Sequence, residues 1–419
     1  MKNNILLILF VLCSFLGFSQ TEYLDGVIVL NEGNAGKDNS SISFISQNNT
    51  LINNVYDLAN PGVDLGNTAQ SLTMHNDIAV VVLNMSNDVK IVNNRTFEHI
   101  ATISGMVNPR YSAVYNNKAY VTCWGAATDV NDYLAVINLT TNTLETTIAV
   151  PNGTEKIKEI NGKLYIAHQD ADFITVYNIA TQQSTQIQVE DTPSELVTLG
   201  SDLYVLCGVP SWGLPTAIAS LHKINLTTDT ATNIFTFPAS VNAFHMDTDG
   251  TDFYITAGPD IYKYNVSANT LTTNALITTP VNDIYMGIYG MNVINNNIYV
   301  ADANGYVNDG KVYVYSLQGS LLNTFTVGKI PNHFYKAKSS LSVKNPEMVS
   351  VSVYPNPASD ILNIQTAESI TNVTAYNIAG QKVLQANTQT LNVSALKSGV
   401  YILKVETTKG SATLKFVKK

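Results

Sequence analysis

Short apolar runs with alternating polar residues recur along most of the chain, and turn-forming residues separate them. Three such runs follow one another at Ala119–Cys123, Tyr133–Asn138 and Leu144–Val150. They are rich in β-branched and aromatic residues, which predicts β-strands joined by turns. A single sheet of this kind cannot bury its apolar side alone, so it needs copies of itself.

The copies are present at a regular spacing. The apolar–Tyr–apolar run around Tyr120 returns around Tyr165, Tyr204, Tyr254 and Tyr299, at intervals of 45, 39, 50 and 45 residues. A repeat of this length made only of short strands is typical of β-propeller blades. With two more blades upstream, near residues 30 and 80, the count reaches about seven. The sequence therefore predicts an all-β chain with a seven-bladed β-propeller over residues 20–337.

The two ends of this region are expected to meet. The mature chain begins with the strand Gly26–Leu30, so the first blade lacks an innermost strand. Residues Pro331–Ala337 follow the last blade and have no sheet of their own. We predict that they supply the missing strand, because pairing the two ends leaves no exposed sheet edge.

Residues 1–19 have the pattern of an export signal. Lys2 precedes an apolar run, Ile5–Phe18, that is too short for a transmembrane anchor. Cys13 would suit a lipoprotein signal, but Leu12 stands where that signal needs a small residue. We therefore predict that residues 1–19 are cleaved and that the mature chain has no transmembrane segment.

The pattern changes near the C-terminus. Residues 338–350 are polar and lack alternation, which indicates a linker. Residues 351–419 then contain about six or seven short strands with turns at Gly380 and Gly410, which predicts a small Ig-like β-sandwich.

Motifs within residues 351–419 resemble the C-terminal sorting domain, type A, of cargo of the type IX secretion system. They comprise Tyr354, Pro355, Asn356, Pro357, Gly380, Gly399, Tyr401, Lys418 and Lys419. The resemblance implies recognition by the type IX machinery, passage through the outer membrane and display on the cell surface. In that family the domain is usually removed and the mature protein attached to lipopolysaccharide. The alternative is an accessory adhesive sandwich.

The larger region resembles the YncE-like surface propellers of the Bacteroidetes. The resemblance rests on Val29–Asn34, Asn39–Phe44, Asn108–Tyr111 and Ala119–Thr122. Some of those relatives bind cobalamin at the outer surface and pass it to a transporter, so the resemblance implies a propeller and names a cobamide as a candidate ligand. Those relatives are typically lipid-anchored, whereas the signal here lacks the lipoprotein pattern.

Charge and cysteine content narrow the function further. The formal net charge is −9, and the only arginines are Arg95 and Arg110, which argues against nucleic acid as a partner. The mature chain keeps Cys123 and Cys207, which we expect to be free and buried, with a disulfide as the alternative. Cysteine and histidine spacing predicts no zinc site.

Ligands of propellers usually lie where loops of successive blades converge on the axis. The loops that follow the repeated tyrosine strands all emerge at one end and contain most of the candidate residues. The candidates for ligand binding are Asn31, Glu32, Arg110, Tyr111, Trp124, His168, Trp212, Asp302 and Asn304. Aromatic faces with a few convergent polar groups suit a small molecule or a glycan.

Each candidate has a plainer interpretation. Trp124 and Trp212 would then only cover loop backbone, and Arg110 would pair with an acid of a neighbouring blade, Glu155 or Glu195. Glu32 would cap its own turn. Asp302 and Asn304 have the alternating oxygen ligands of a calcium loop but lack its closing Glu, so a solvated turn is the alternative.

No nucleophile elbow, His-Glu-x-x-His sequence or phosphate-binding glycine loop is present, so we predict no catalytic residue. The sequence favours a surface-displayed protein that binds a small molecule. A module that binds a glycan or a protein is the second interpretation. An enzyme of the propeller lyase or lactonase type, with Glu32 and His168 as acid and base, is the third.

Overall fold

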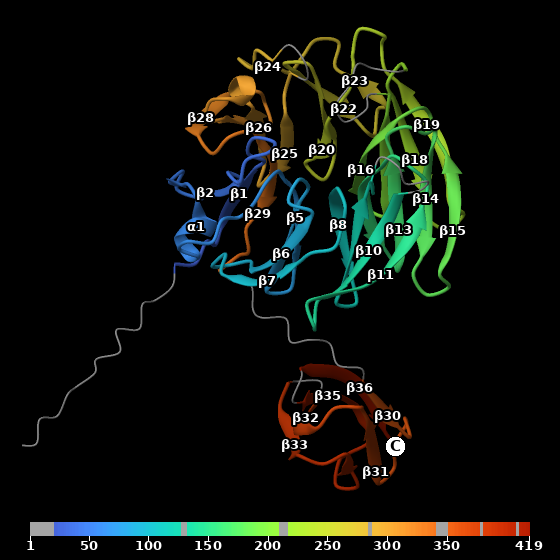
Figure 1. Ribbon diagram of the computed structural model, residues 1–419. Coiled ribbons are helices and arrows are strands. Elements are labelled where there is room, and N and C mark those ends of the chain that lie inside the picture. Colours follow the sequence, from blue (N-terminus) through green and yellow to red (C-terminus); the bar gives the residue numbers. More distant parts are fainter. Residues whose placement is uncertain are drawn as a thin grey trace, which may run out of the picture. The chain divides into compact units, whose positions relative to one another are not determined.

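The computed structural model describes residues 21–126, 132–208, 217–283, 287–340, 351–377, 380–407 and 410–419 (Figure 1). The predicted signal, Trp212 and the part of the predicted linker from residue 341 to 350 lie outside these ranges. The chain divides into two compact units, residues 1–340 and residues 341–419. Within the described ranges, no helix is long and apolar enough to cross a membrane.

The regular structure of the described residues is almost entirely antiparallel β-sheet. In the first unit these residues form seven sheets. The first sheet has the order β29-β1-β2-β3, with β29 at Pro331–Lys336, β1 at Gly26–Asn31, β2 at Ser41–Ser46 and β3 at Leu51–Ile52. The short helix α1 (Val55–Ala59) leads from this sheet to the next.

In the other six sheets the strands follow one another along the chain. The second contains β4 (Ala69–His75), β5 (Ile78–Leu83), β6 (Asp88–Asn93) and β7 (His99–Ile103). The third contains β8 (Pro109–Tyr115), β9 (Lys118–Cys123), β10 (Asp132–Asn138) and β11 (Thr143–Val150). The fourth contains β12 (Thr154–Ile160), β13 (Lys163–His168), β14 (Phe173–Asn178) and β15 (Gln183–Gln188).

The last three sheets repeat this plan. The fifth contains β16 (Pro193–Leu199), β17 (Asp202–Cys207), β18 (Ser220–Asn225) and β19 (Thr230–Thr236). The sixth contains β20 (Met246–Thr248), β21 (Phe253–Ala257), β22 (Asp260–Asn265), β23 (Thr270–Leu271) and β24 (Ile277–Thr278). The seventh contains β25 (Gly290–Ile294), β26 (Asn297–Asp302), β27 (Lys311–Ser316) and β28 (Leu321–Thr326), with a short 3-10 turn at Asn304–Tyr306.

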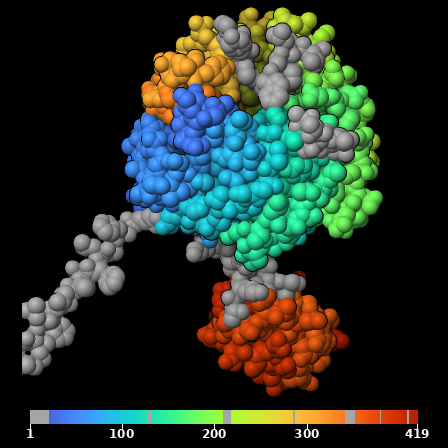
Figure 2. Space-filling model, viewed as in Figure 1, coloured from blue at the N-terminus to red at the C-terminus, as the bar shows by residue number. Residues whose placement is uncertain are grey.

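The innermost strands of the seven sheets form a closed ring. β4, β8, β12, β16, β20 and β25 contact one another in this order, and β29 contacts both β25 and β4. Successive sheets therefore follow one another around the first unit, as the change of colour from blue through green to orange shows (Figures 1 and 2). This arrangement is propeller-like, as the repeat predicted.

Each pair of neighbouring sheets shares one apolar core. Successive side chains of a strand point to opposite faces, so the strands next to the ring are buried on both sides. Val121 of β9 packs with Val80 of the second sheet, while the adjacent Tyr120 packs with Leu164 of the fourth. The seventh and first sheets are joined in the same way, where Val312 and Val29 share a core. This packing explains why the tyrosine strands are apolar at nearly every position.

The predicted closure of the ring is confirmed. β29 pairs antiparallel with β1, so that Phe334 lies opposite Val29 and Tyr335 opposite Ile28. The backbone N–H of Asp25 donates to the carbonyl of Lys338, and the N–H of Ser340 donates to the Asp25 carboxylate. The chain therefore stays attached to the first unit through residue 340.

Cys123 and Cys207, the two cysteines among the described residues, are free and buried, as predicted. Cys123 ends β9 and Cys207 ends β17, in the third and fifth sheets. Burial raises the pKa of the Cys123 thiol to about 12, so this thiol is held protonated and unreactive.

The second unit contains two antiparallel sheets. One has the order β33 (Lys382–Ala386), β32 (Ile370–Asn377), β35 (Gly399–Thr407) and β36 (Ser411–Lys418). The other has the order β30 (Ser352–Tyr354), β31 (Ile361–Gln365) and β34 (Thr390–Asn392). Side chains of both sheets share one core, in which Tyr401 stacks on Phe416 with ring centroids 5.4 Å apart.

Candidate functional site

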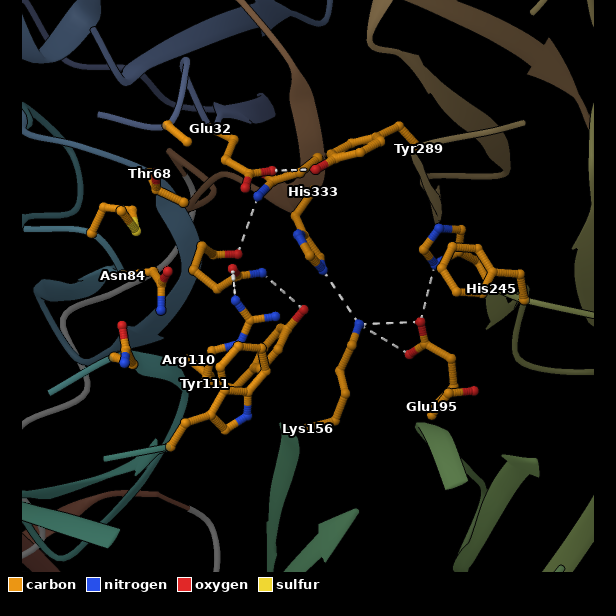
Figure 3. A pocket seen from close by; sticks show the side chains of 18 residues that line it. Glu32, Thr68, Asn84, Arg110, Tyr111, Lys156, Glu195, His245, Tyr289 and His333 are labelled. Carbon is orange, nitrogen blue, oxygen red and sulfur yellow. Dashed lines mark hydrogen bonds and ion pairs between the residues drawn. The ribbon is translucent and has the colours of Figure 1, made fainter. Parts of the chain in front are cut away.

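A cavity of about 430 Å³ lies at the centre of the ring, where the innermost strands begin (Figure 3). We call it the axial cavity. Its volume is in the range of sites that bind small molecules. It is lined by Glu32, Ala35, Thr68, Gln70, Asn84, Met85, Asn108, Arg110, Tyr111, Trp124, Lys156, Ser194, Glu195, Phe244, His245, Tyr289, Asn332 and His333.

Arg110 is the second residue of β8, and its guanidinium is held from three sides. It donates to both carboxylate oxygens of Glu155 on β12, at 3.0 Å from Nε and 2.7 Å from Nη2. Its Nη1 donates to the side-chain oxygen of Gln70 on β4. The ion pair is buried, with 7% of the Arg110 and 2% of the Glu155 side chain exposed. Arg110 therefore links three neighbouring sheets. Of the two acids predicted as its partner, Glu155 is the one that pairs with it.

Trp124 lies directly after β9 and covers this ion pair. The Arg110 guanidinium carbon is 4.0 Å from the centre of the indole ring, which is a cation–π contact. The indole N–H donates to the carbonyl of Thr154 at 2.7 Å. Both interactions fix the orientation of the ring, so Trp124 forms a preorganised aromatic wall of the cavity.

A second group of charges lies on the opposite wall. Lys156 of β12 donates to Glu195 of β16 at 3.1 Å. Burial alone would raise the pKa of Glu195, but Lys156 and His245 outweigh it and lower that pKa. Glu195 is therefore a carboxylate, and it can only accept a hydrogen bond from Nδ1 of His245, 3.2 Å away. When the His245 ring is neutral, its proton is therefore on Nδ1, and Nε2 carries a lone pair that can accept a hydrogen bond.

His333 of β29 has the opposite tautomer. Its Nε2 lies 3.3 Å from Nζ of Lys156, and an ammonium can only donate. Burial, together with the charge of Lys156, lowers the pKa of His333 well below its ordinary value, so the ring is neutral. The proton must then be on Nδ1, which makes this atom a hydrogen-bond donor.

Three polar atoms of the lining are buried without a hydrogen-bond partner among the described residues. They are Nε2 of His245, Nδ1 of His333 and the side-chain oxygen of Asn332. The Asn332 amide nitrogen donates to the carbonyls of Ala69 and Gln70, which fixes its oxygen as the free end. Unsatisfied buried polar atoms are costly and often mark functional sites.

Glu32 and Tyr289 form the third polar contact of the cavity. The Tyr289 hydroxyl donates to Oε2 of Glu32 at 2.7 Å. Burial raises the pKa of Glu32 despite this hydrogen bond, and it raises that of Tyr289 as well. The neutral acid is therefore favoured more than in an exposed glutamate.

The axial cavity brings together four of the nine predicted candidates, which are Glu32, Arg110, Tyr111 and Trp124. Asn31 is buried between strands, and its amide donates to Ser41 and Ser43. His168 is also buried outside the cavity, between the carbonyl of Asn152 and the Thr175 hydroxyl. Trp212 lies outside the described residues.

Asp302 and Asn304 lie at a separate hollow on the seventh sheet. The carboxylate of Asp302 accepts the backbone N–H of Asn304 at 2.8 Å, and the Asn304 amide donates to the carbonyl of Asp309. These contacts stabilise the turn itself. Calcium binding there stays a prediction.

Most of the charged residues that line the cavity were not among the predicted candidates. The candidates came mainly from loops, whereas these residues lie on the innermost strands. A sequence signal for it exists. Tyr111, Lys156, Glu195 and His245 each stand nine residues before a repeated tyrosine, at Tyr120, Tyr165, Tyr204 and Tyr254. This position is polar in four of the five repeats and is glycine, Gly290, before Tyr299, so four successive repeats indicate side chains that face the axis.

Fold and cavity together define the protein as a propeller-like β-protein with an axial pocket. Residues 25–339 match the family described as a domain of unknown function, DUF5074. This match covers most of the chain, so the protein belongs to the DUF5074 family. Comparison with curated proteins gave no match.

Residues 352–419 match the secretion system C-terminal sorting domain, in agreement with the predicted sorting motifs. The protein is therefore exported by the type IX secretion system to the cell surface, and its C-terminal unit is the part that the machinery recognises.

Solved structures support the fold. A functionally unknown protein from Desulfotomaculum acetoxidans has a TM-score of 0.57 and 13% identity, over 75% of this chain and 100% of that chain. A quinoprotein alcohol dehydrogenase-like protein from Bacteroides thetaiotaomicron has a TM-score of 0.55 and 15% identity, over 76% of this chain and 79% of that chain. At these identities the similarity concerns the fold alone.

Proposed function

We propose that this protein is a seven-bladed, YncE-like β-propeller with an Ig-like sorting domain, and that its axial cavity binds a small, electrically neutral molecule at the cell surface. The observation that carries the proposal is the pairing of charges in the cavity. Arg110 is paired with Glu155, and Lys156 with Glu195. An anion would find no free cation among the described residues there, and Glu32 is shifted towards its neutral form by burial, so a charged ligand would lose its hydration with little compensation.

The unpaired atoms define which groups the ligand carries. A hydroxyl or N–H group of the ligand would donate to Nε2 of His245 or to the oxygen of Asn332. A carbonyl or hydroxyl oxygen would accept the proton of Nδ1 of His333. The aromatic rings of Trp124 and Tyr289 supply flat apolar surface beside these groups. A molecule with several hydroxyl or amide groups around a ring satisfies all of these requirements.

A mono- or disaccharide fits this description well, which favours a glycan over the other classes. A cobamide is larger than a cavity of about 430 Å³, so only one of its edges would enter. A protein partner would present a single side chain to the cavity.

The proposal is tested by calorimetric titration of the mature protein with a panel of neutral mono- and disaccharides and with cyanocobalamin. We expect one neutral sugar to bind. Trp124→Ala should weaken this binding by about tenfold or more, equivalent to about 1.4 kcal/mol. Leu321→Ala, an exposed residue on the outer strand β28, serves as the control and should bind as the wild type does. Unchanged affinity in Trp124→Ala would remove the axial cavity from consideration.

An enzyme is the second candidate, and His245 is the observation that favours it. A histidine whose Nδ1 is held by a carboxylate and whose Nε2 is free is arranged as a general base. His245 would take this role in place of the Glu32–His168 pair, because His168 lies outside the cavity. Catalysis would be supported if the wild type turns over a bound sugar or lactone and His245→Gln still binds this compound but no longer turns it over. Binding without turnover would leave the protein a binding module.

A further inference from the structure

A second cavity, of about 420 Å³, lies further along the same innermost strands. We call it the lower cavity. Tyr111, Lys156, Glu195 and His333 line both cavities, so these four side chains form a layer between them. The remaining lining comes from residues further along the same strands. Every innermost strand contributes to it, so the lower cavity also lies on the axis.

Lys158 of β12 lines the lower cavity two residues after Lys156. Lys156 has Glu195 as its partner, whereas the side chain of Lys158 makes no ion pair or hydrogen bond with any described residue. Burial lowers the pKa of Lys158, and the charge of Asp247 acts in the opposite direction. The ammonium is thus partly desolvated and has no anion in contact with it.

Asp247 of β20 lines the same cavity, on a strand two positions along the ring from β12. Its carboxylate accepts three hydrogen bonds, from the backbone N–H groups of Thr248 and Val293 and from the Asn292 amide. These fix its orientation, but no cation contacts it among the described residues. Burial raises its pKa, and these three hydrogen bonds act in the opposite direction.

Lys158 and Asp247 therefore present opposite charges to one cavity without touching each other. Glu159 of β12 also lines this cavity, where it accepts the backbone N–H of Gly162 at 2.7 Å. Each of the two free charges would be stabilised by a partner of the opposite sign. One molecule that carries both signs would satisfy both residues at once.

We propose that the lower cavity binds a small zwitterion of the α-amino acid class, with its carboxylate on Lys158 and its ammonium on Asp247. This site differs from the axial cavity in its chemistry. In the axial cavity Arg110 and Lys156 are both ion-paired, which favours a neutral ligand, whereas the lower cavity has a lysine and an aspartate that make no ion pair with any described residue. The inference therefore stands whether or not the axial cavity binds a sugar.

Calorimetric titration of the mature protein with the set of common α-amino acids tests the inference. We expect at least one amino acid to bind, and its N-acetyl and carboxamide derivatives to bind at least tenfold more weakly, since each lacks one charge. Lys158→Met should weaken the amino acid by tenfold or more. Lys37→Met, which removes an exposed loop lysine, is the matched control and should change nothing.

Further variants locate the site. Asp247→Asn should weaken the amino acid as strongly as Lys158→Met does, and a thermal melt of both variants checks that they are folded. Trp124→Ala should leave amino acid affinity unchanged. The inference is overturned if no amino acid binds, if Lys158→Met binds as the wild type does, or if Trp124→Ala alone abolishes binding.

Discussion

Nζ of Lys156 lies 3.3 Å from Nε2 of His333, and the same ammonium contacts Glu195 at 3.1 Å. One cation therefore sets the state of two neighbours: it holds Glu195 as a carboxylate and His333 as a neutral ring with its proton on Nδ1. His245 completes the chain, because it donates to the same carboxylate. The protonation states of Glu195 and His333 are thus both set by Lys156.

The protonation of His333 provides a first test. Burial and the Lys156 charge both lower its pKa well below the ordinary value, so the ring should still be neutral at the pH where an exposed histidine is half protonated. Histidine-labelled protein in an NMR titration reports this directly. In Lys156→Met one of the two causes is gone, so the pKa of His333 should rise. Protonation of His333 near pH 6.5 in the wild type would contradict the assigned tautomer.

Glu32 should destabilise the fold as the pH rises. Burial raises the pKa of Glu32 in the folded state above its value in the unfolded state. The contribution of Glu32 to the free energy of unfolding is therefore fully present below the unfolded-state pKa, and it is lost as the pH rises through the folded-state pKa. Glu32→Gln keeps an oxygen for the Tyr289 hydroxyl and removes this titration. As the pH rises above about 4.3, the ordinary pKa of a glutamate, the free energy of unfolding of the wild type should fall relative to the variant. If urea unfolding shows that the stabilities of the wild type and of Glu32→Gln change with pH by the same amount, the raised pKa of Glu32 is refuted.

The ring of sheets was predictable because its strands carry a strong signal. Tyr120 and Val121 face two different apolar cores, so both must be apolar, and the same constraint acts on Tyr165 and Tyr204. The closing strand was also predictable, since Pro331–Lys336 had no sheet of its own.

The lining of the axial cavity was harder to predict for a physical reason. On the innermost strands, Lys156 and Glu195 stand among a mixture of polar and apolar residues, as they would on a strand that faces solvent. Local alternation does not distinguish a side chain that faces the axis from one that faces bulk water. The position nine residues before each tyrosine becomes informative only when the repeats are aligned. The acidic partner of Arg110 could be predicted, because an arginine in a buried strand needs a carboxylate to pair with.

The buried pair of Arg110 and Glu155 should be costly to break from one side. Arg110→Met leaves a carboxylate with 2% of its side chain exposed and without its cation, and should lower the free energy of unfolding by about 3–5 kcal/mol. The double variant with Glu155→Leu no longer contains the unpaired carboxylate, so it should recover much of the free energy of unfolding that Arg110→Met loses. Chemical denaturation of the single and double variants measures both effects. A double variant that is less stable than Arg110→Met would show that the charge itself is not the cause.

Closure by β29 should decide whether the first unit folds. β1 is buried along its whole length and lies between β29 and β2, so without β29 the backbone groups of β1 that face the axis lose their partners. A chain of residues 20–340 should melt cooperatively at the temperature of the first unit in the full-length protein. A chain of residues 20–330 should give no cooperative transition.

A point variant tests the same contact without truncation. Phe334 is 3% exposed and packs against Tyr299 of the seventh sheet and against Val29 of the first. Phe334→Ala should therefore cost about 3–5 kcal/mol, since it opens a cavity at the junction of the two chain ends. Leu321→Ala, on the exposed outer strand β28, should cost far less. If the 20–330 chain and Phe334→Ala both melt like the wild type, the ring does not depend on its last strand, because the other six sheets then hold β1 in place on their own.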